Sequence, residues 1–269
     1  MAEKEIKGKP KLDFVPVPEE LKAVEKTIEI LDKGEELPIP LTKQEEKEKR
    51  IADAKKEALA SWVPKTELGK AVKEGKIKDI DEILSQGKKI LEAEIVDTLL
   101  NLESDLLLIG QSKGKFGGGK RRAWRQTQKK TMEGNVPSFS CMAVVGDKNG
   151  HVGIGMGKSK ETLPSREKAL REAKLNIIKV TRGFESRESS KADPHTVPFV
   201  VEGKCGSVRI KLIPAPRGTG LVIGDECKKI LRLAGIKDVY AVTKGQTRTV
   251  FNFAQACINA LIKTNKMKL

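Results

Sequence analysis

One segment of the chain resembles a phosphate-binding loop: residues 153–159 read GIGMGKS. Such a loop needs four residues between its first glycine and the Gly-Lys pair, so that successive N–H groups can surround the phosphates. Here Gly153 and Gly157 enclose only three residues, and no acidic strand end follows that could hold magnesium. The spacing therefore argues against nucleotide hydrolysis. If this segment is a strand, its alternate glycines bare one face, where a phosphate or a packed helix can approach the backbone.

Histidines and cysteines give no sign of a catalytic or metal site. His151 and His195 stand 44 positions apart, one beside a turn glycine and one in a linker, and neither has an evident acid or nucleophile partner. The four cysteines are scattered and form no CxxC pair. They are expected to be buried, reduced thiols: Cys141, Cys205, Cys227 and Cys257. The sequence thus predicts no catalytic residue, no metal and no cofactor.

The densest signal is a basic run, residues 111–132, which holds eight Lys or Arg and no acidic residue. Its glycines give a flexible backbone, and Phe116 and Trp124 offer rings that can stack on bases, although Trp124 could equally anchor the segment in the protein. This combination predicts contact with RNA. The candidate contacts here are Lys113, Lys115, Lys120, Arg121, Arg122, Trp124, Arg125, Lys129 and Lys130.

Composition agrees with a polyanionic partner. The 269 residues carry a net charge of +15, and only 4% are aromatic. Residues 1–60 hold 13 basic and 15 acidic side chains, so the positive charge belongs to the rest of the chain. Charge alone does not choose between nucleic acid, an anionic membrane and an acidic protein. No apolar run reaches the roughly 18 residues of a spanning helix and no apolar signal core is present, so neither a membrane location nor secretion is expected.

Two helical regions are expected before the basic run. Residues 19–34 carry apolar side chains at Leu21, Val24, Ile28 and Leu31, which predicts an amphipathic helix. We expect residues 1–60 to form a charged N-terminal arm that orders on a partner or stays partly disordered. Residues 61–105 predict short helices, separated by glycines, that form a helical brace.

Residues 106–183 are expected to form a sheet with one helix. Residues 138–145 alternate as a strand, Asn149-Gly150 signals a tight turn because both residues tolerate positive φ, and residues 151–155 return as a second strand. A helix is expected over residues 165–180, with Ala169, Ala173, Ile177 and Val180 inward. Three strands with a helix across one side outline a double-stranded-RNA-binding-like fold, which reads phosphates and helix shape more than base sequence.

After a polar linker at residues 184–194, residues 195–269 are expected to form a small α/β sandwich. Strands are predicted at 197–201, 207–213 and 238–242, and helices at 225–234 and 251–263. In the loop at 213–224, two prolines stiffen the chain while Gly218 and Gly220 permit a sharp reversal.

Two blocks of the sequence, residues 138–183 and a second block that begins at His195, resemble ribosomal protein five of the small subunit position by position. In the first block the match includes Val145-Gly146-Asp147, residues 149–153, Gly157-Lys158 and Ala173-Lys174; the second runs from His195 almost to the C-terminus and includes PAPRGTG. Upstream, residues 62–72 are similar to the WxPxTxLGxxV pattern of the archaeal and eukaryotic type.

This resemblance implies an α+β protein with a left-handed βαβ crossover in its second domain, against the usual hand. It implies a non-enzymatic constituent of the cytoplasmic ribosome that binds ribosomal RNA where head meets body, near the entrance of the messenger RNA path, and supports translational accuracy. Its neighbours would be ribosomal proteins four and eight, with no membrane contact and no second copy of the chain. Together with the basic character, it gives these further RNA contacts: Gly153, Gly155, Gly157, Lys158, Lys160, Arg166, Arg182, Lys204, Arg209, Arg217, Thr219 and Arg248.

Two other functions stay open at this point. A free double-stranded-RNA-binding factor for assembly or regulation would have the same basic surface but would be absent from most mature ribosomes. A phosphoryl-transfer enzyme is the second, because the fold implied for the C-terminal domain is shared with some kinases; it would bind nucleotide and depend on Lys158.

Overall fold

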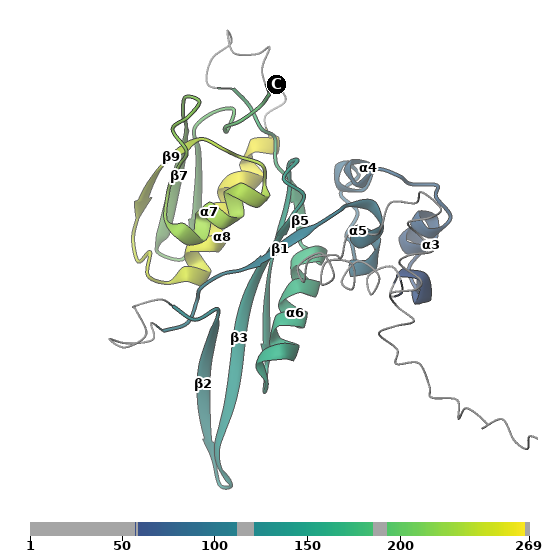
Figure 1. Ribbon diagram of the computed structural model, residues 1–269, viewed down its shortest axis with the longest axis vertical. Coiled ribbons are helices and arrows are strands. Elements are labelled where there is room, and N and C mark those ends of the chain that lie inside the picture. The colour runs from purple at the N-terminus through teal and green to yellow at the C-terminus, as the bar shows by residue number, and fades with distance from the viewer. Residues whose placement is uncertain (1–56, 58, 112–120, 185–192, 267–269) are drawn as a thin grey trace, which may run out of the picture. The chain divides into compact units, whose positions relative to one another are not determined.

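The computed structural model describes residue 57 and residues 59–111, 121–184 and 193–266, and the chain from Leu59 onward forms one compact unit. Figure 1 shows its elements. The helix expected within residues 19–34 lies outside the described residues. Three short helices confirm those expected in the brace: α3 (Glu67–Lys73), α4 (Ile80–Ser85) and α5 (Ala93–Leu99). Thr66 caps α3 by accepting from the Gly69 N–H, and Gly75 and Gly87, both at positive φ, follow α3 and α4.

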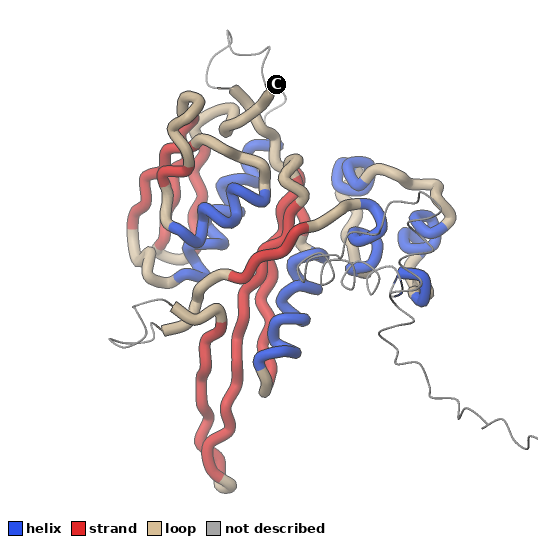
Figure 2. The backbone as a smooth tube through the Cα atoms, in the orientation of Figure 1, coloured by secondary structure: helices blue, strands red, loops and turns tan. Residues whose placement is uncertain are grey.

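The first sheet is antiparallel and is built around one long strand, β3 (Gly134–Gly146). Its partners are β1 (Glu103–Leu106), β2 (Trp124–Thr131) and β4 (His151–Ser159), and β5 (Ile177–Lys179) pairs with β4. β1 and β2 share one edge of β3: β1 pairs with residues 143–146 and β2 with residues 134–141. In Figure 2, β2 and the first part of β3 form a long hairpin that extends past the rest of the sheet.

The structure corrects several local expectations. The second half of the basic run, where no strand was expected, is strand β2, which pairs along its whole length with β3. Helix α6 (Thr162–Leu175) ends before Ile177, since residues 177–179 pair with β4 instead. The turn after β3 exists, but its positive φ angles fall on Lys148 and Gly150 rather than on Asn149.

The second sheet has the order β6-β7-β9-β8. Its strands are β6 (Val201–Cys205), β7 (Val208–Pro214), β8 (Leu221–Val222) and β9 (Val239–Lys244). The strand expected at 197–201 is wrong: β6 begins at Val201, and Pro198, which has no N–H to donate to a ladder, lies before it. Helix α7 (Asp225–Leu233) connects β8 to β9, which pair in parallel; the hand of this crossover stays a prediction. Helix α8 (Val250–Ile262) and a short 3₁₀ turn (Lys263–Lys266) follow.

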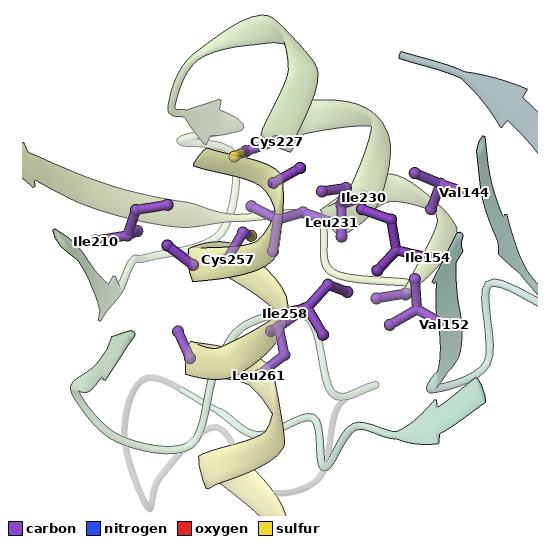
Figure 3. Close-up of a cluster of buried hydrophobic side chains, with 14 of the residues drawn as sticks. Val144, Val152, Ile154, Ile210, Cys227, Ile230, Leu231, Cys257, Ile258 and Leu261 are labelled. Carbon is purple, nitrogen blue, oxygen red and sulfur yellow. The ribbon is translucent and has the colours of Figure 1, made fainter. Parts of the chain in front are cut away.

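Helices cover both faces of the first sheet. Ala169 and Ala173 of α6 are fully buried against one face. On the other, side chains of β3 and β4 share a core cluster with α7 and α8, drawn in Figure 3. The labelled members from the sheet are Val144, Val152 and Ile154, and those from the helices are Cys227, Ile230, Leu231, Cys257, Ile258 and Leu261.

Candidate nucleic-acid interface

The glycines of β4 meet a helix. A Cβ atom on Gly155 would lie 2.2 Å from the Ala173 nitrogen, and one on Gly157 would lie 2.1 Å from the Ser165 carbonyl oxygen. A Cβ atom on Gly153 would likewise lie 2.2 Å from the Ala173 carbonyl oxygen. Of the two roles open to these glycines, the structure gives them helix packing. Because all three are buried, they leave the set of RNA contacts.

The GKS segment is strand, not loop. β4 runs without a break to Ser159. The hydroxyl of Ser165 donates to the carbonyls of Phe139 (3.1 Å) and Gly157 (2.9 Å), which ties the start of α6 to the two strands. The backbone N–H groups needed to cradle a nucleotide phosphate are therefore not arranged as a loop here.

The opposite face of the hairpin is basic. Arg125 of β2 pairs with Ser140 of β3, and Ser140 pairs with Lys158 of β4, so all three lie on one face in one row. Strand spacing puts the Arg125 and Lys158 backbones about 9.5 Å apart. Lys129 lies on the same face of β2, roughly 13 Å further along the strand. We call Arg125, Lys129 and Lys158 the hairpin face.

Each residue of the hairpin face is exposed. Their side chains have no ion pair or hydrogen bond within the described part of the chain, and β2, β3 and β4 contain no acidic residue. Cations held in this way, without internal partners, are arranged to meet an external anion.

Trp124 has a packing role. Its ring makes an edge contact with Phe139, with centroids 5.3 Å apart, and the Arg122 guanidinium lies 4.9 Å from the ring centroid. It packs against a small cluster with Leu106 and Leu170, on the α6 side of the sheet. Of the two roles left open for Trp124, the structure favours the anchor.

A second row of cations, Lys204, Arg209 and Lys244, crosses the outer face of the second sheet, and we call it the basic row. Lys204 of β6 pairs with Arg209 of β7, and Arg209 pairs with Lys244 of β9. All three are exposed, while Val208 and Ile210 of β7 turn inward. Like charges placed directly opposite one another destabilise a sheet. The sequence could not identify Lys244, because its place depends on the strand register.

The other predicted contacts are dispersed. Arg121, Lys130, Lys160 and Arg248 are exposed, and Arg166 is half-buried with its Nε atom unpartnered. The Arg217 guanidinium donates to the Asp193 carbonyl (3.1 Å), beside the half-buried Thr219. Gly218 and Gly220 have φ of 85° and 72°, which confirms the sharp reversal expected in this loop. Lys113, Lys115 and Lys120 lie outside the described residues.

His151 has acidic partners that the sequence did not reveal. Its Nδ1 lies 2.6 Å from an Asp147 carboxylate oxygen and its Nε2 lies 2.9 Å from an Asp81 oxygen, and Asp81 also pairs with Lys179. The expectation that His151 has no acid partner is therefore wrong. Asp147 is four positions upstream, across the β3–β4 turn, and Asp81 is 70 positions away in the brace, so only the fold shows that both meet His151. We call Asp81, Asp147, His151 and Lys179 the histidine bridge.

These contacts shift the pKa values of the bridge. The hydrogen bond to Asp147 raises the pKa of His151 against the opposing effect of burial, and Asp81 raises it further. Burial alone would raise the pKa of Asp147, but hydrogen bonds from the His151 ring and from backbone N–H groups lower it. The bridge links α4 to the β3–β4 turn, so its geometry is that of a structural connection.

Cys141, Cys227 and Cys257 are buried, as expected, whereas Cys205 is only partly buried. Cys227 is fully buried, and its pKa is raised by a hydrogen bond with Cys257 and by burial, so it stays a thiol. His195, expected in a linker, is buried too. Among the described residues, no group of three or more His, Cys, Asp or Glu side chains could hold a metal ion. Nor does any helix there have the length and apolar character needed to cross a membrane.

Comparison with known proteins agrees with this architecture. Residues 123–181 match the family described as ribosomal protein S5, N-terminal domain, and residues 203–268 match ribosomal protein S5, C-terminal domain. Over 212 residues the chain is 51% identical to the small ribosomal subunit protein uS5 of Nanoarchaeum equitans, which covers 78% of this chain and 91% of the relative. The uS5 protein of Pyrobaculum aerophilum is 48% identical (78% and 90% covered), and that of Methanococcus maripaludis is 45% identical (82% and 90%). The chain therefore belongs to the ribosomal protein S5 family, whose members are structural and non-enzymatic.

Proposed function

We propose that this protein is a structural constituent of the small ribosomal subunit that binds ribosomal RNA through the hairpin face and the basic row on the second sheet. The observation that carries the proposal is the strand register. It brings Arg125, Lys129 and Lys158 onto one exposed face of strands that contain no acidic residue. Membership of the S5 family supports the ribosomal setting.

The finer parts of the proposal rest on the family resemblance. The first sheet with α6 is proposed to be a double-stranded-RNA-binding-like fold, preceded by a helical arm, and the β8-α7-β9 crossover to be left-handed. The protein would lie in cytoplasmic ribosomes where head meets body, with messenger RNA and ribosomal proteins four and eight as neighbours, and would support translational accuracy.

The phosphate contacts are tested by the salt dependence of RNA binding. Each phosphate contact contributes roughly 0.7–0.9 to the slope of log affinity against log salt. The triple variant Arg125→Gln, Lys129→Gln, Lys158→Gln should therefore flatten the slope by about 2–3. The measurement is binding of a labelled small-subunit ribosomal RNA transcript between 50 and 200 mM KCl, roughly the range over which the effect is large.

A matched control removes the same charge elsewhere. Lys70, Lys78 and Lys89 of the brace are exposed and also lie outside any basic row, so their joint change to Gln should leave the slope near that of the wild type. Equal slopes for both triple variants would show that the hairpin face does not contact phosphates.

The ribosomal setting has its own test. We expect the tagged chromosomal protein to sediment as one copy per mature small subunit, retained at high salt. A pool that is free, or bound only to precursor particles, would instead support an assembly or regulatory factor.

A further inference from the structure

A cavity of about 780 Å³ lies between residues of the first sheet's domain and residues of the second. Its walls come from the β3–β4 turn, the segment after β5, the segment before β6, α7, and the loops before β8 and β9. The charged side chains that line it are five basic and one acidic: Lys148, Arg182, Lys228, Arg232, Lys237 and Asp193. Only Arg182 belongs to the contacts expected from sequence.

Two of the five positive charges are already neutralised. Lys148 pairs with Glu103, and Lys228 pairs with Asp225 at 2.9 Å. Arg182 is held by neutral groups, because its guanidinium donates to the backbone carbonyls of Lys148 (3.3 Å) and Asn149 (3.1 Å). Those bonds fix its position and leave its charge uncompensated.

Arg232 and Lys237 have no side-chain hydrogen bond or ion pair within residues 59–111, 121–184 and 193–266. Three positive charges thus face the cavity against the one carboxylate of Asp193. An internal ion pair does not explain this excess, whereas an anionic ligand does.

The walls are tied together by backbone bonds. The Lys148 N–H donates to the Leu233 carbonyl (2.9 Å), which fastens the β3–β4 turn to the end of α7. Gly235 has φ of 81°, and a Cβ there would lie 2.0 Å from the Lys148 carbonyl oxygen, so only glycine allows this approach. On the far side, the Gly220 N–H donates to the Asp238 carboxylate (2.8 Å). The backbone segments that carry the cations are therefore fixed before a ligand binds, which lowers the entropic cost of binding.

We propose that this cavity binds a phosphate group, with Arg182, Arg232 and Lys237 as its contacts. Guanidinium groups suit phosphate oxygens because they can donate two parallel hydrogen bonds. The volume falls within the range of ordinary ligand pockets, roughly 300–1,000 Å³, so it admits a nucleotide unit as well as a bare ion. The phosphate can come from the RNA backbone, which rests on the proposed function, or from a free phosphate or nucleotide.

The RNA source is tested with the double variant Arg232→Gln, Lys237→Gln in the full chain. It should flatten the salt slope of binding to the ribosomal RNA transcript by about 1.5–2, the share of two phosphate contacts. The control is Lys78→Gln, Lys89→Gln, which removes the same charge and should bind as the wild type does. Thermal unfolding of both variants checks that the fold is kept.

The free-anion source is tested with inorganic phosphate and with AMP. Saturable shifts of the Gly220 and Gly235 amide signals in the NMR spectrum of the wild type, lost in the double variant, would support it. The proposal is overturned if neither anion moves these signals and the double variant binds RNA as its control does. If the wild type itself fails to bind the transcript, the proposed function fails, and the anion titration alone decides the cavity.

Discussion

Single atoms decide how closely α6 lies on the first sheet. Glycine at 153, 155 and 157 lets the helix backbone approach β4 to a distance that any Cβ would prevent. The facing positions of α6 hold small residues, Ala169 and Ala173, which are both fully buried. This close contact holds α6 against one face of the first sheet, whose other face carries Arg125 and Lys158.

Gly155→Ala should destabilise the protein by about 2–3 kcal/mol, because the new methyl group would overlap backbone atoms of α6 that cannot move aside. For a unit of this size that corresponds to a fall in melting temperature of roughly 5–10 °C. Gly75→Ala is the matched comparison. Gly75 has open space around it and only a positive φ of 74°, so about 1 kcal/mol of strain is expected. Equal losses in thermal unfolding would mean that helix packing does not explain the β4 glycines.

Connections between elements depend on a few polar contacts, of which the histidine bridge is the clearest. It joins α4 of the brace to β4 and β5 of the first sheet, since Asp81 contacts both His151 and Lys179. His151 and Lys179 are themselves direct neighbours across β4 and β5. The side chains of His151 and Asp147 are only 12% and 8% exposed, so solvent screens their contact weakly. Asp81 and Lys179 are 43% and 48% exposed, so solvent screens the contacts of Asp81 more strongly.

Stability should depend on pH through this bridge. The folded pKa of His151 is raised, so its contribution is complete below the unfolded value of about 6.5 and is lost as pH rises through the folded value. The pKa values of Asp81 and Asp147 are lowered, so their contribution is complete above about 3.9 and is lost as pH falls through the folded values. The bridge should therefore stabilise most between about pH 4 and 6.5.

His151→Gln should cost about 1–2 kcal/mol at pH 5.5 and should flatten the decline in stability between pH 6.5 and 8.5. Urea unfolding at several pH values measures both effects. His195 is kept in the variant, so any decline that remains belongs to other groups. An unchanged pH profile would show that His151 is not the titrating residue.

Local pattern predicted most elements but not their partners. The short brace helices, the β3–β4 hairpin and both C-terminal helices follow from periodicity and turn residues. Strand β2 did not, because WRQTQKKT has almost no apolar alternation and is a strand only by pairing with β3. For the same reason the sequence named Arg125, Lys158, Lys204 and Arg209 without showing that they form rows. Register and long-range pairs such as Asp81 with His151 are properties of the folded chain.

Across the whole described unit, the two sheets depend on one core. The cluster that contains Val144 and Ile154 of the first sheet continues through Leu231 of α7 to Leu261 of α8. Loss of α7 or α8 would therefore expose apolar side chains of both sheets. The hairpin face, the basic row and the cavity between the domains are consequently held in one frame.

This shared core predicts a single cooperative unfolding transition for residues 59–269. Both tryptophans, Trp62 and Trp124, precede the second domain, so their fluorescence follows the brace and the first sheet, while far-ultraviolet circular dichroism follows all elements. Leu231→Ala, in α7, should destabilise by about 2–5 kcal/mol and shift both signals together. Val222→Ala, at a residue that is 49% exposed, should shift neither by more than about 0.5 kcal/mol. If Leu231→Ala instead left the fluorescence transition in place and added a second step in circular dichroism alone, the two domains would unfold independently. The residues that line the cavity between the domains would then not be held in fixed positions relative to one another.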